Sequence, residues 1–192
     1  MTRIILATAN KDKVREFQRI LDKYGIKIEP APYSIKVVET GRDFIENAIL
    51  KARAYYKEFS LPTLSDDSGL EVDILGKAPG IFSARFSEGD YMDNIKKVLK
   101  QIYAFPEERF TARFVCAVCL IDKNGILHIA QESCEGYIIK EIRGDNGFGY
   151  DPIFYYPELE KTFGEINSEV KDKVSHRGRA LRKLFDNLPW EE

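Results

Sequence analysis

The chain has few of the features that identify secreted or membrane proteins. Its 192 residues include only three cysteines, Cys116, Cys119 and Cys134, which is too few for a disulfide framework. No run of about 18 apolar residues is available to cross a membrane. The stretch Met1-Thr2-Arg3-Ile4-Ile5-Leu6 is too short for a signal peptide. We therefore expect a cytoplasmic protein that makes no membrane contact.

The cysteines also lack the partners that a zinc site requires. Cys116 and Cys119 lie within a continuous apolar run, residues 114–121, and no second pair of Cys or His residues lies nearby. Structural zinc sites normally use four such ligands. The pattern predicts free cysteines that pack in the core.

Strong charge of either sign is missing as well. The formal net charge is -2 and the sequence pI is about 5.9. A nucleic-acid-binding module would usually show a basic stripe with interleaved aromatic residues and a high pI, so we expect no stable nucleic-acid binding. Any anion site must be a local concentration of Lys, Arg and backbone amides.

The hydrophobic pattern predicts alternating strands and helices, followed by a β-hairpin block. Helices are predicted over residues 10–24, 41–59, 90–103 and 175–187, and strands over 3–8, 26–30, 110–121, 126–134 and 136–142. Residues 63–66 and 70–75 are expected to flank an acidic turn. This order predicts one α/β folding unit with a mixed rather than purely parallel sheet.

The expected acidic turn, Ser65-Asp66-Asp67-Ser68-Gly69, is the most informative stretch. Adjacent carboxylates repel, so such a pair is expected at a cap, at a turn or around a cation. Asp67 is suited to bind Mg²⁺ together with substrate phosphates, and to accept a proton from an attacking water. Glu39, just before a predicted helix, can supply a second carboxylate. The alternative is an ordinary turn in which Asp66 or Ser68 bonds its own backbone.

A second candidate lies where the first strand meets the first helix, in Thr8-Ala9-Asn10-Lys11-Asp12-Lys13. Free N–H groups and the helix dipole make such a junction an anion site. Thr8 and Asn10 can donate to phosphate oxygens, and Lys13 can add a charge. The glycines of a P-loop are absent. The alternative is a plain N-cap followed by a solvated lysine.

A third group lies in the second half of the chain. Phe148 and Asp151 belong to a glycine-containing loop, where an aromatic ring can stack on a nucleobase and a carboxylate can accept from ring N–H groups. Lys171, His176 and Arg177 can donate to a carbonyl or a phosphate. The alternatives are a loop anchored in the core by Phe148 and an ordinary solvated helix start.

Taken together and in this order, six stretches resemble the Ham1/RdgB family of non-canonical purine nucleoside triphosphate pyrophosphatases, the inosine/xanthosine triphosphatase family. They run nearly from end to end of the chain: Thr8-Ala-Asn-Lys-Asp-Lys13, Phe44-Ile-Glu-Asn-Ala-Ile-Leu-Lys-Ala52, Ser65-Asp-Asp-Ser-Gly-Leu70, Pro79-Gly-Ile-Phe-Ser-Ala-Arg85, Gly147-Phe-Gly-Tyr-Asp-Pro152 and Ser175-His-Arg177.

The resemblance implies Mg²⁺-dependent hydrolysis of ITP, dITP and XTP to the monophosphate and pyrophosphate, which keeps deaminated purines out of DNA and RNA. It implies a homodimer, and a single domain over residues 1–192. That domain would be an elongated mixed β-sheet flanked by helices, in two lobes with a central cleft. A Maf-like nucleotide pyrophosphatase for pyrimidine or modified nucleotides is the nearest alternative, and a nucleotide sensor without turnover is a further one.

The resemblance also implies a role for particular residues. It makes Asp67 the catalytic proton acceptor and, with Glu39, a metal ligand. The polyphosphate would be held by residues from Thr8 to Lys13, by Ser68, and by Lys51 nearby. The base pocket would be formed by Phe148, Gly149, Tyr150, Asp151, Lys171, His176 and Arg177.

Overall fold

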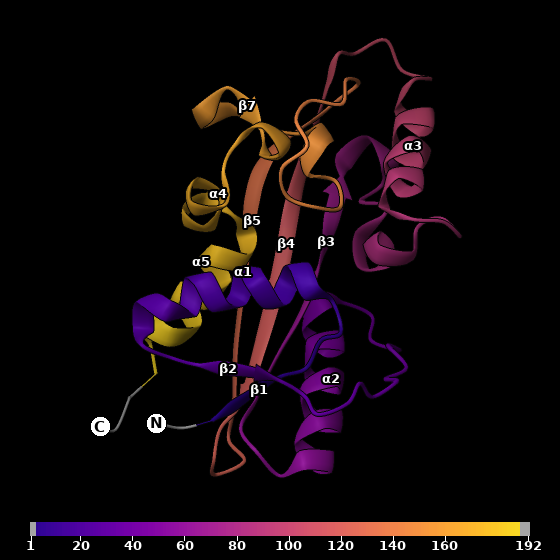
Figure 1. The fold of residues 1–192 in the computed structure, drawn as a ribbon. Helices are drawn as coiled ribbons and strands as arrows, with labels where there is room; N and C mark the ends of the chain where they lie inside the picture. Colours follow the sequence, from indigo (N-terminus) through magenta and orange to yellow (C-terminus); the bar gives the residue numbers. More distant parts are fainter. Residues whose placement is uncertain (1–2, 189–192) are drawn as a thin grey trace. The chain divides into compact units, whose positions relative to one another are not determined.

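A computed structural model of the protein describes residues 3–188, and its strands form one mixed sheet (Figure 1). The strand order is β2-β1-β3-β4-β5-β6-β7. The strands are Ile4–Leu6 (β1), Ile28–Pro30 (β2), Thr63–Val72 (β3), Arg109–Ile121 (β4), Leu127–Ile139 (β5), Phe154–Tyr156 (β6) and Lys161–Thr162 (β7). Strand β1 runs parallel to β2 and β3, whereas β6 runs antiparallel to β5 and β7. The predicted α/β class with a mixed sheet is confirmed.

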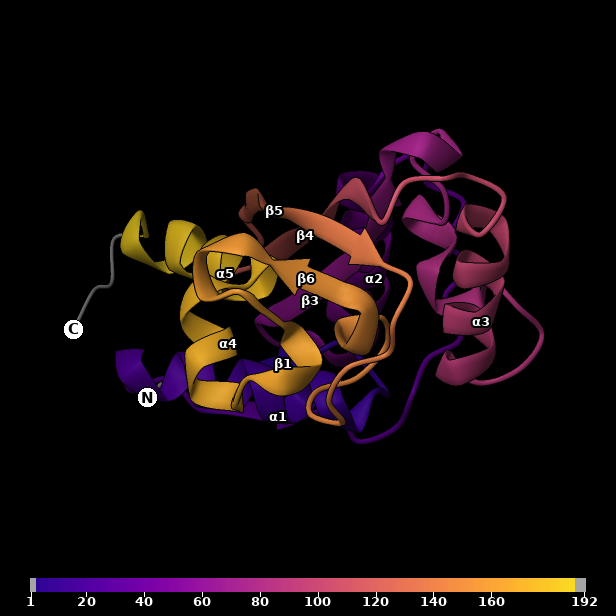
Figure 2. The same cartoon turned by 90° about the horizontal axis from the view of Figure 1, so that it is seen from above.

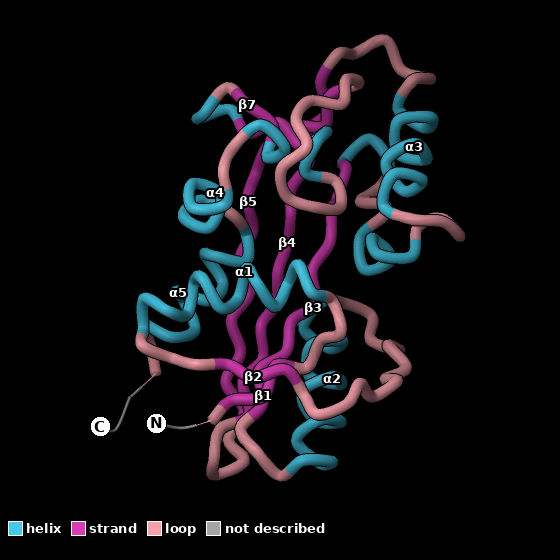
Figure 3. The backbone as a smooth tube through the Cα atoms, in the orientation of Figure 1, coloured by secondary structure: helices cyan, strands magenta, loops and turns pink. Residues whose placement is uncertain are grey.

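The long helices lie where the hydrophobic pattern predicts them, to within a few residues (Figure 3). The helices are Lys11–Leu21 (α1), Phe44–Phe59 (α2), Tyr91–Ile102 (α3), Ser168–Val174 (α4) and His176–Asp186 (α5). Asn10, Asp43 and Asp90 cap the first three of these, each accepting backbone N–H bonds at the helix start. The short helix α4 and the strands β6 and β7 were not predicted.

The predicted acidic turn is wrong, because residues 63–72 form one uninterrupted strand, β3. Successive side chains of a strand point to opposite faces, so two adjacent carboxylates are kept apart without a turn. The prediction of a separate strand over residues 136–142 is also wrong. Its first half continues β5, which runs unbroken from Leu127 to Ile139.

The chain divides into two compact units, each with its own core. Unit 1 takes the chain up to Asp67, then Cys116–Glu132 and the residues from His176 onward, and unit 2 takes Ser68–Val115 and Ser133–Ser175. In unit 1, the apolar side of α1 packs with that of α5 around β1 and β4. In unit 2, α3 packs against the short helix Gly80–Arg85 (Figure 2). The cleft between two lobes that the resemblance implies stays a prediction.

The hairpin and the cysteine predictions are both confirmed. The turn between β4 and β5 closes on Asp122, whose carboxylate accepts the backbone N–H groups of Asn124 and Ile126. Gly125 supplies the left-handed conformation there, at φ +77°. All three cysteines are free and buried, and burial raises the pKa of Cys119 to about 12. Within residues 3–188 no helix has both the length and the apolar character of a membrane span.

Candidate active site

The alternation of β3 places its two carboxylates in different surroundings within unit 1. Asp66 accepts from Lys13 Nζ (2.8 Å), whereas Asp67 accepts from Asn47 Nδ2 (3.1 Å) and Lys51 Nζ (3.2 Å). Both aspartates are buried, with 2% and 7% of their surface exposed. Each carboxylate therefore has its own set of partners, and the repulsion between neighbours in the sequence is offset on both faces of the strand.

Asp66 belongs to a buried ion-pair network that joins three distant parts of the chain. Its Oδ2 accepts from Lys13 and lies 3.4 Å from Arg177 Nη2, while Arg177 Nη1 donates to Glu16 Oε2 at 2.5 Å. Burial alone would raise the pKa of Asp66, but the charges of Lys13 and Arg177 outweigh it and hold this pKa well below its ordinary range. The network keeps Asp66 ionised at any pH near neutrality.

For Asp67, the effects that raise the pKa outweigh those that lower it. Burial raises its pKa, and the nearby charges of Glu39 and Asp66 act in the same direction, against the lowering effect of Lys51 and Lys13. A carboxylate with a raised pKa is a better proton acceptor than an ordinary one. Of the two aspartates, Asp67 is the one whose surroundings suit acid–base chemistry.

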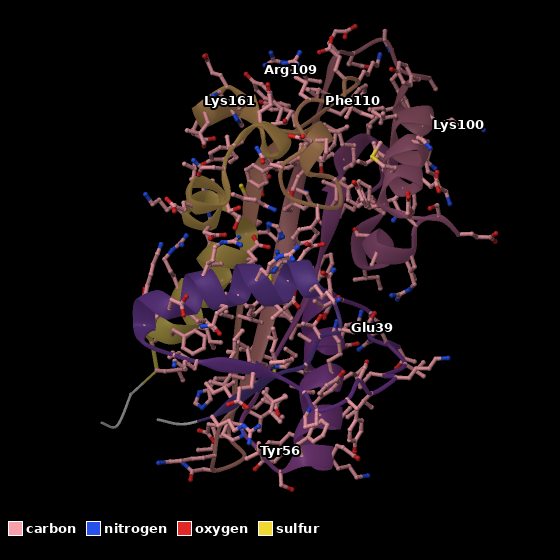
Figure 4. The ribbon with its side chains drawn as sticks, viewed as in Figure 1. Glu39, Tyr56, Lys100, Arg109, Phe110 and Lys161 are labelled. Atoms are coloured by element: carbon pink, nitrogen blue, oxygen red, sulfur yellow. The ribbon has the colours of Figure 1, made fainter. Side chains whose placement is uncertain are left out.

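Glu39 and Asp67 converge on one ammonium group. Lys51 Nζ donates to Glu39 Oε1 at 2.6 Å and to Asp67 Oδ1 at 3.2 Å. Figure 4 shows Glu39 on the loop that leads into α2. Burial lowers the pKa of Lys51, but the carboxylates beside it raise it more strongly. Two carboxylate oxygens thus face a point that already holds a positive charge.

The junction before α1 is a built helix start. Asn10 Oδ1 accepts the backbone N–H groups of Asp12 and Lys13, at 2.9 and 3.2 Å, and Thr8 Oγ1 accepts that of Asn10. Ala9, Asn10 and Lys11 are exposed. The plain N-cap considered from the sequence is therefore present, and the Lys13 side chain is held by Asp66 rather than solvated.

In unit 2, the structure brings together the loop residues and Lys171. Asp151 Oδ2 accepts from Lys171 Nζ (2.6 Å) and from the backbone N–H of Phe148 (2.8 Å). Lys171 Nζ also lies 4.8 Å from the centre of the Phe148 ring. Gly149 turns the chain at φ +63°, a conformation that favours glycine. These four residues form one compact group on the loop and α4.

The remaining predicted residues are placed as follows. Tyr150 is buried and donates through its hydroxyl to the Ser83 carbonyl at 2.9 Å. Ser68 lies half-buried on β3, as the first residue of unit 2, and His176 is the buried first residue of α5 in unit 1. Lys171 and His176, although close in sequence, belong to different units.

Two contact residues escaped the sequence reasoning, Asn47 and Glu16. Asn47 is fully buried at the spacing of the apolar face of α2, where Phe44 and Ala48 also lie. A polar residue on such a face must have a hydrogen-bond partner, and this was the available signal. Glu16 sits next to the buried Phe17 on α1, but nothing local indicates a partner as distant as Arg177.

The fold is that of a known class of nucleotide-processing proteins. The sequence model of the Ham1 family matches residues 4–187, and the chain belongs to this family. It is 43% identical to a dITP/XTP pyrophosphatase of Geobacillus kaustophilus, over 100% of this chain and 96% of that protein. It is 44% identical to the protein of that name from Desulforamulus reducens, over 97% and 95%.

Solved structures agree with this membership. A Ham1 protein from Coxiella burnetii superposes with a TM-score of 0.84 at 41% identity, covering 96% of each chain. The Ham1 protein of Staphylococcus aureus gives a TM-score of 0.82 at 35% identity, covering 95% of this chain and 96% of that one. Both comparisons extend over nearly the whole chain, so the fold is shared and not only a motif.

Proposed function

We propose that this chain hydrolyses non-canonical purine nucleoside triphosphates (ITP, dITP and XTP) to the monophosphate and pyrophosphate. Such an activity would keep deaminated purines out of DNA and RNA. The names of the close relatives support this substrate class. The observation that carries the chemistry is the convergence of Glu39 and Asp67 on a single cationic point, with Lys13 on the other side of β3.

The phosphate chain is assigned to the helix start and its neighbours. The segment from Thr8 to Lys13 lies at the positive end of the dipole of α1, which is an 11-residue helix. The Thr8 and Asn10 side chains orient this segment through their own hydrogen bonds. Lys13 and Lys51 supply charge, and Ser68 a hydroxyl. These groups would offset much of the negative charge of a triphosphate.

Mg²⁺ is the cation that fits the carboxylate pair. Among residues 3–188 no three His, Cys, Asp or Glu side chains gather into a complete metal cage. Magnesium rarely uses such a cage: it is held by one or two carboxylates together with substrate phosphates and water. Glu39 and Asp67 provide two such oxygens. Bound magnesium would neutralise phosphate charge and hold the reacting groups in place.

We assign the transfer of the water proton and the neutralisation of phosphate charge to side chains of this protein. Asp67 accepts the proton of the attacking water, for which its raised pKa suits it. Lys51 shifts from the two carboxylates to the phosphate oxygens. Asp66 stays ionised and holds Lys13 and Arg177 throughout. In this scheme the two aspartates have separate tasks, proton transfer and positioning.

We assign the base to Phe148, Gly149, Tyr150, Asp151 and Lys171 of unit 2, and a role for His176 and Arg177 of unit 1 is what the resemblance implies. The Phe148 ring offers a stacking surface, and Lys171 and Arg177 are charged donors suited to the 6-keto oxygen of hypoxanthine or xanthine. Adenine presents an amino group at that position. It would leave the donors unpaired, which rejects a ligand more strongly than a missing methylene does.

The decisive experiment measures pyrophosphate release across a nucleotide panel, with and without Mg²⁺. We expect ITP, dITP and XTP to be cleaved far faster than ATP, and cleavage to stop when EDTA removes the metal. Preferential cleavage of pyrimidine triphosphates, or the same rate in EDTA, would contradict the proposal. We also propose that the enzyme is a cytoplasmic homodimer, as the resemblance implies.

A further inference from the structure

Helix α2 holds Asp67 through two side chains one turn apart. Asn47 and Lys51 occupy positions i and i+4, which face the same side of a helix. Asn47 Nδ2 donates to Asp67 Oδ2 at 3.1 Å, and Lys51 Nζ donates to Asp67 Oδ1 at 3.2 Å. Each carboxylate oxygen therefore has its own donor, and the plane of the carboxylate is fixed.

The same two side chains also hold the segment that carries Glu39. Lys51 Nζ donates to Glu39 Oε1 at 2.6 Å, and the backbone N–H of Gly41 donates to Asn47 Oδ1 at 2.8 Å. Asp67 lies on β3, whereas Glu39 and Gly41 lie on the loop before α2. The helix thus links two carboxylates whose own backbones belong to different elements.

The orientation of the Asn47 amide follows from these contacts. A backbone N–H can only donate, so the Asn47 oxygen must face Gly41 and its NH₂ group must face Asp67. Asn47 is completely buried, and an amide in such a place keeps both bonds because losing either would strand a polar group away from water. Asn47 therefore has one arrangement that satisfies both of its partners.

Close packing around Asn47 reinforces this arrangement. A Cβ atom on Gly41 would lie 2.6 Å from Asn47 Oδ1 and 2.7 Å from the Asn47 backbone nitrogen, so only glycine fits. On the other side, Ser65 Oγ donates to the Ala48 carbonyl at 2.6 Å and fastens α2 to β3 one residue before the aspartate pair. The part of α2 that carries Asn47 is therefore attached to β3 as well as to the loop at Gly41.

We propose that Asn47 is a positioning residue that organises Asp67 and the Glu39 segment as a ready-made pair of ligands for a divalent cation. The inference rests on the proposed function. Lys51 lies between the carboxylates and must give way when a cation binds there, whereas the neutral Asn47 amide keeps its bonds with or without the cation. Such outer partners typically change metal affinity or activity by about 10–100-fold.

The chain supplies a closely matched control in Asn94. It is a buried Asn at the same position in α3 as Asn47 in α2, four residues after the N-cap, and it accepts a backbone N–H of the preceding loop, that of Ser87 at 2.6 Å. It lies in unit 2 and no proposed ligand belongs to its surroundings. Asn94→Ala removes the same kind of loop anchor without touching Asp67.

The experiment compares Mn²⁺ binding, followed by electron paramagnetic resonance, in wild type, Asn47→Ala and Asn94→Ala, together with urea unfolding and ITP kinetics. We expect both variants to unfold at lower urea concentration. We expect Asn47→Ala alone to bind Mn²⁺ about 10–100-fold more weakly. Its kcat at fixed Mg²⁺ should fall, to be partly recovered at higher Mg²⁺, with KM for ITP within about twofold of wild type.

A folded Asn47→Ala variant that binds Mn²⁺ as wild type does would overturn the inference. Should Asn47→Ala not fold, Asn47→Leu makes the same test, because a leucine of similar size fills the same buried space while removing both hydrogen bonds of the amide. The Mn²⁺ affinities decide the positioning role by themselves. Pyrophosphate release by wild type decides the proposed function, so failure of one is distinguishable from failure of the other.

Discussion

Asp66 and Asp67 are neighbours in the sequence and lie on opposite faces of β3, one bound to Lys13 and the other to Lys51. The difference in surroundings gives the two carboxylates opposite pKa shifts: the pKa of Asp66 is lowered and that of Asp67 is raised. Pairs of titratable groups whose pKa values are pushed apart are typical of acid–base sites. The predictions below test this separation of tasks.

Asp67→Asn should abolish most turnover and leave the fold intact. Losing one general base costs about 10²–10⁴-fold in kcat, and weaker metal binding adds to this loss. Both Asp67 oxygens accept hydrogen bonds, so the NH₂ group of an Asn would face a donor, and we expect a lower urea midpoint for a variant that still folds. The control is Asp73→Asn, an exposed acid of unit 2 bound to Arg113. Near-normal ITP cleavage by Asp67→Asn would remove Asp67 from the mechanism.

Lys13→Met should destabilise the protein, most clearly near neutral pH. A hydrogen bond to a charged group contributes about 1.5–3 kcal/mol, and Asp66 would lose its nearest cation. Because its folded-state pKa is lowered, Asp66 stabilises the fold above its unfolded pKa of about 3.9, and this contribution fades as pH falls below that value. The stability difference between wild type and Lys13→Met should therefore be largest near pH 7 and should narrow as the pH falls below that value.

Urea unfolding between pH 7 and pH 3 measures this effect. Lys183→Met is the matched control, since Lys183 forms a more exposed pair with Glu132 in the same unit. Exposed pairs contribute about 0–1 kcal/mol. Equal losses in the two variants would mean that the Lys13 pair behaves as an ordinary surface contact.

Arg177→Ala should affect both stability and base selectivity. Arg177 is 1% exposed and bridges Glu16 and Asp66, so its removal leaves two buried carboxylates short of a cation, at a cost of about 3–5 kcal/mol. If Arg177 also donates to the 6-keto oxygen, the folded variant should lose roughly ten- to a hundredfold of its preference for ITP over ATP.

Comparison with Lys13→Ala separates base reading from phosphate binding. Lys13→Ala should lower kcat/KM for every triphosphate by a similar factor, since all share the phosphate chain. Arg179→Ala, on the same helix as Arg177, controls for general loss of charge. An equal decrease for ITP and ATP in Arg177→Ala would identify Arg177 as a phosphate ligand, and the base-reading donor would then be Lys171 or the backbone.

If the protein is a homodimer, sedimentation at micromolar concentration should show a single species. Its mass should be twice the chain mass of 22.1 kDa. At 192 residues the chain has enough core to fold alone, so the dimer is not a requirement of stability. A species at the mass of one chain would contradict it.

The sequence was sufficient to predict the fold wherever local signals agree. The alternating apolar pattern identified the long helices, and Asn10 and Gly25 mark the limits of the first helical segment because caps act within one turn. The turn around Asp122 follows from Asn-Gly chemistry in the same way. Each of these features depends on residues a few positions apart.

The errors arise where distant partners decide the structure. The adjacent residues Asp66 and Asp67 suggested a turn because the neighbouring sequence shows only that their carboxylates repel each other. Lys13 and Arg177, separated from Asp66 by 53 and 111 residues, remove the need for one. From the sequence alone, Asn47 is an ordinary residue of a predicted helix. Its contacts with Gly41 and Asp67 become known only from the structure. The sequence motifs were therefore enough to name most of the residues of the candidate site. They were not enough to predict the hydrogen bonds among those residues.

The reactivity of the buried cysteines can be used to measure how often the folded chain opens. A thiol reacts with alkylating agents as the thiolate, and burial raises the pKa of the Cys116 and Cys119 thiols so far that almost none exists near neutral pH. All three thiols become reactive only where the chain opens. Iodoacetamide labelling thus measures the opened fraction of the untagged protein, with Cys134 reporting from unit 2 and the other two from unit 1.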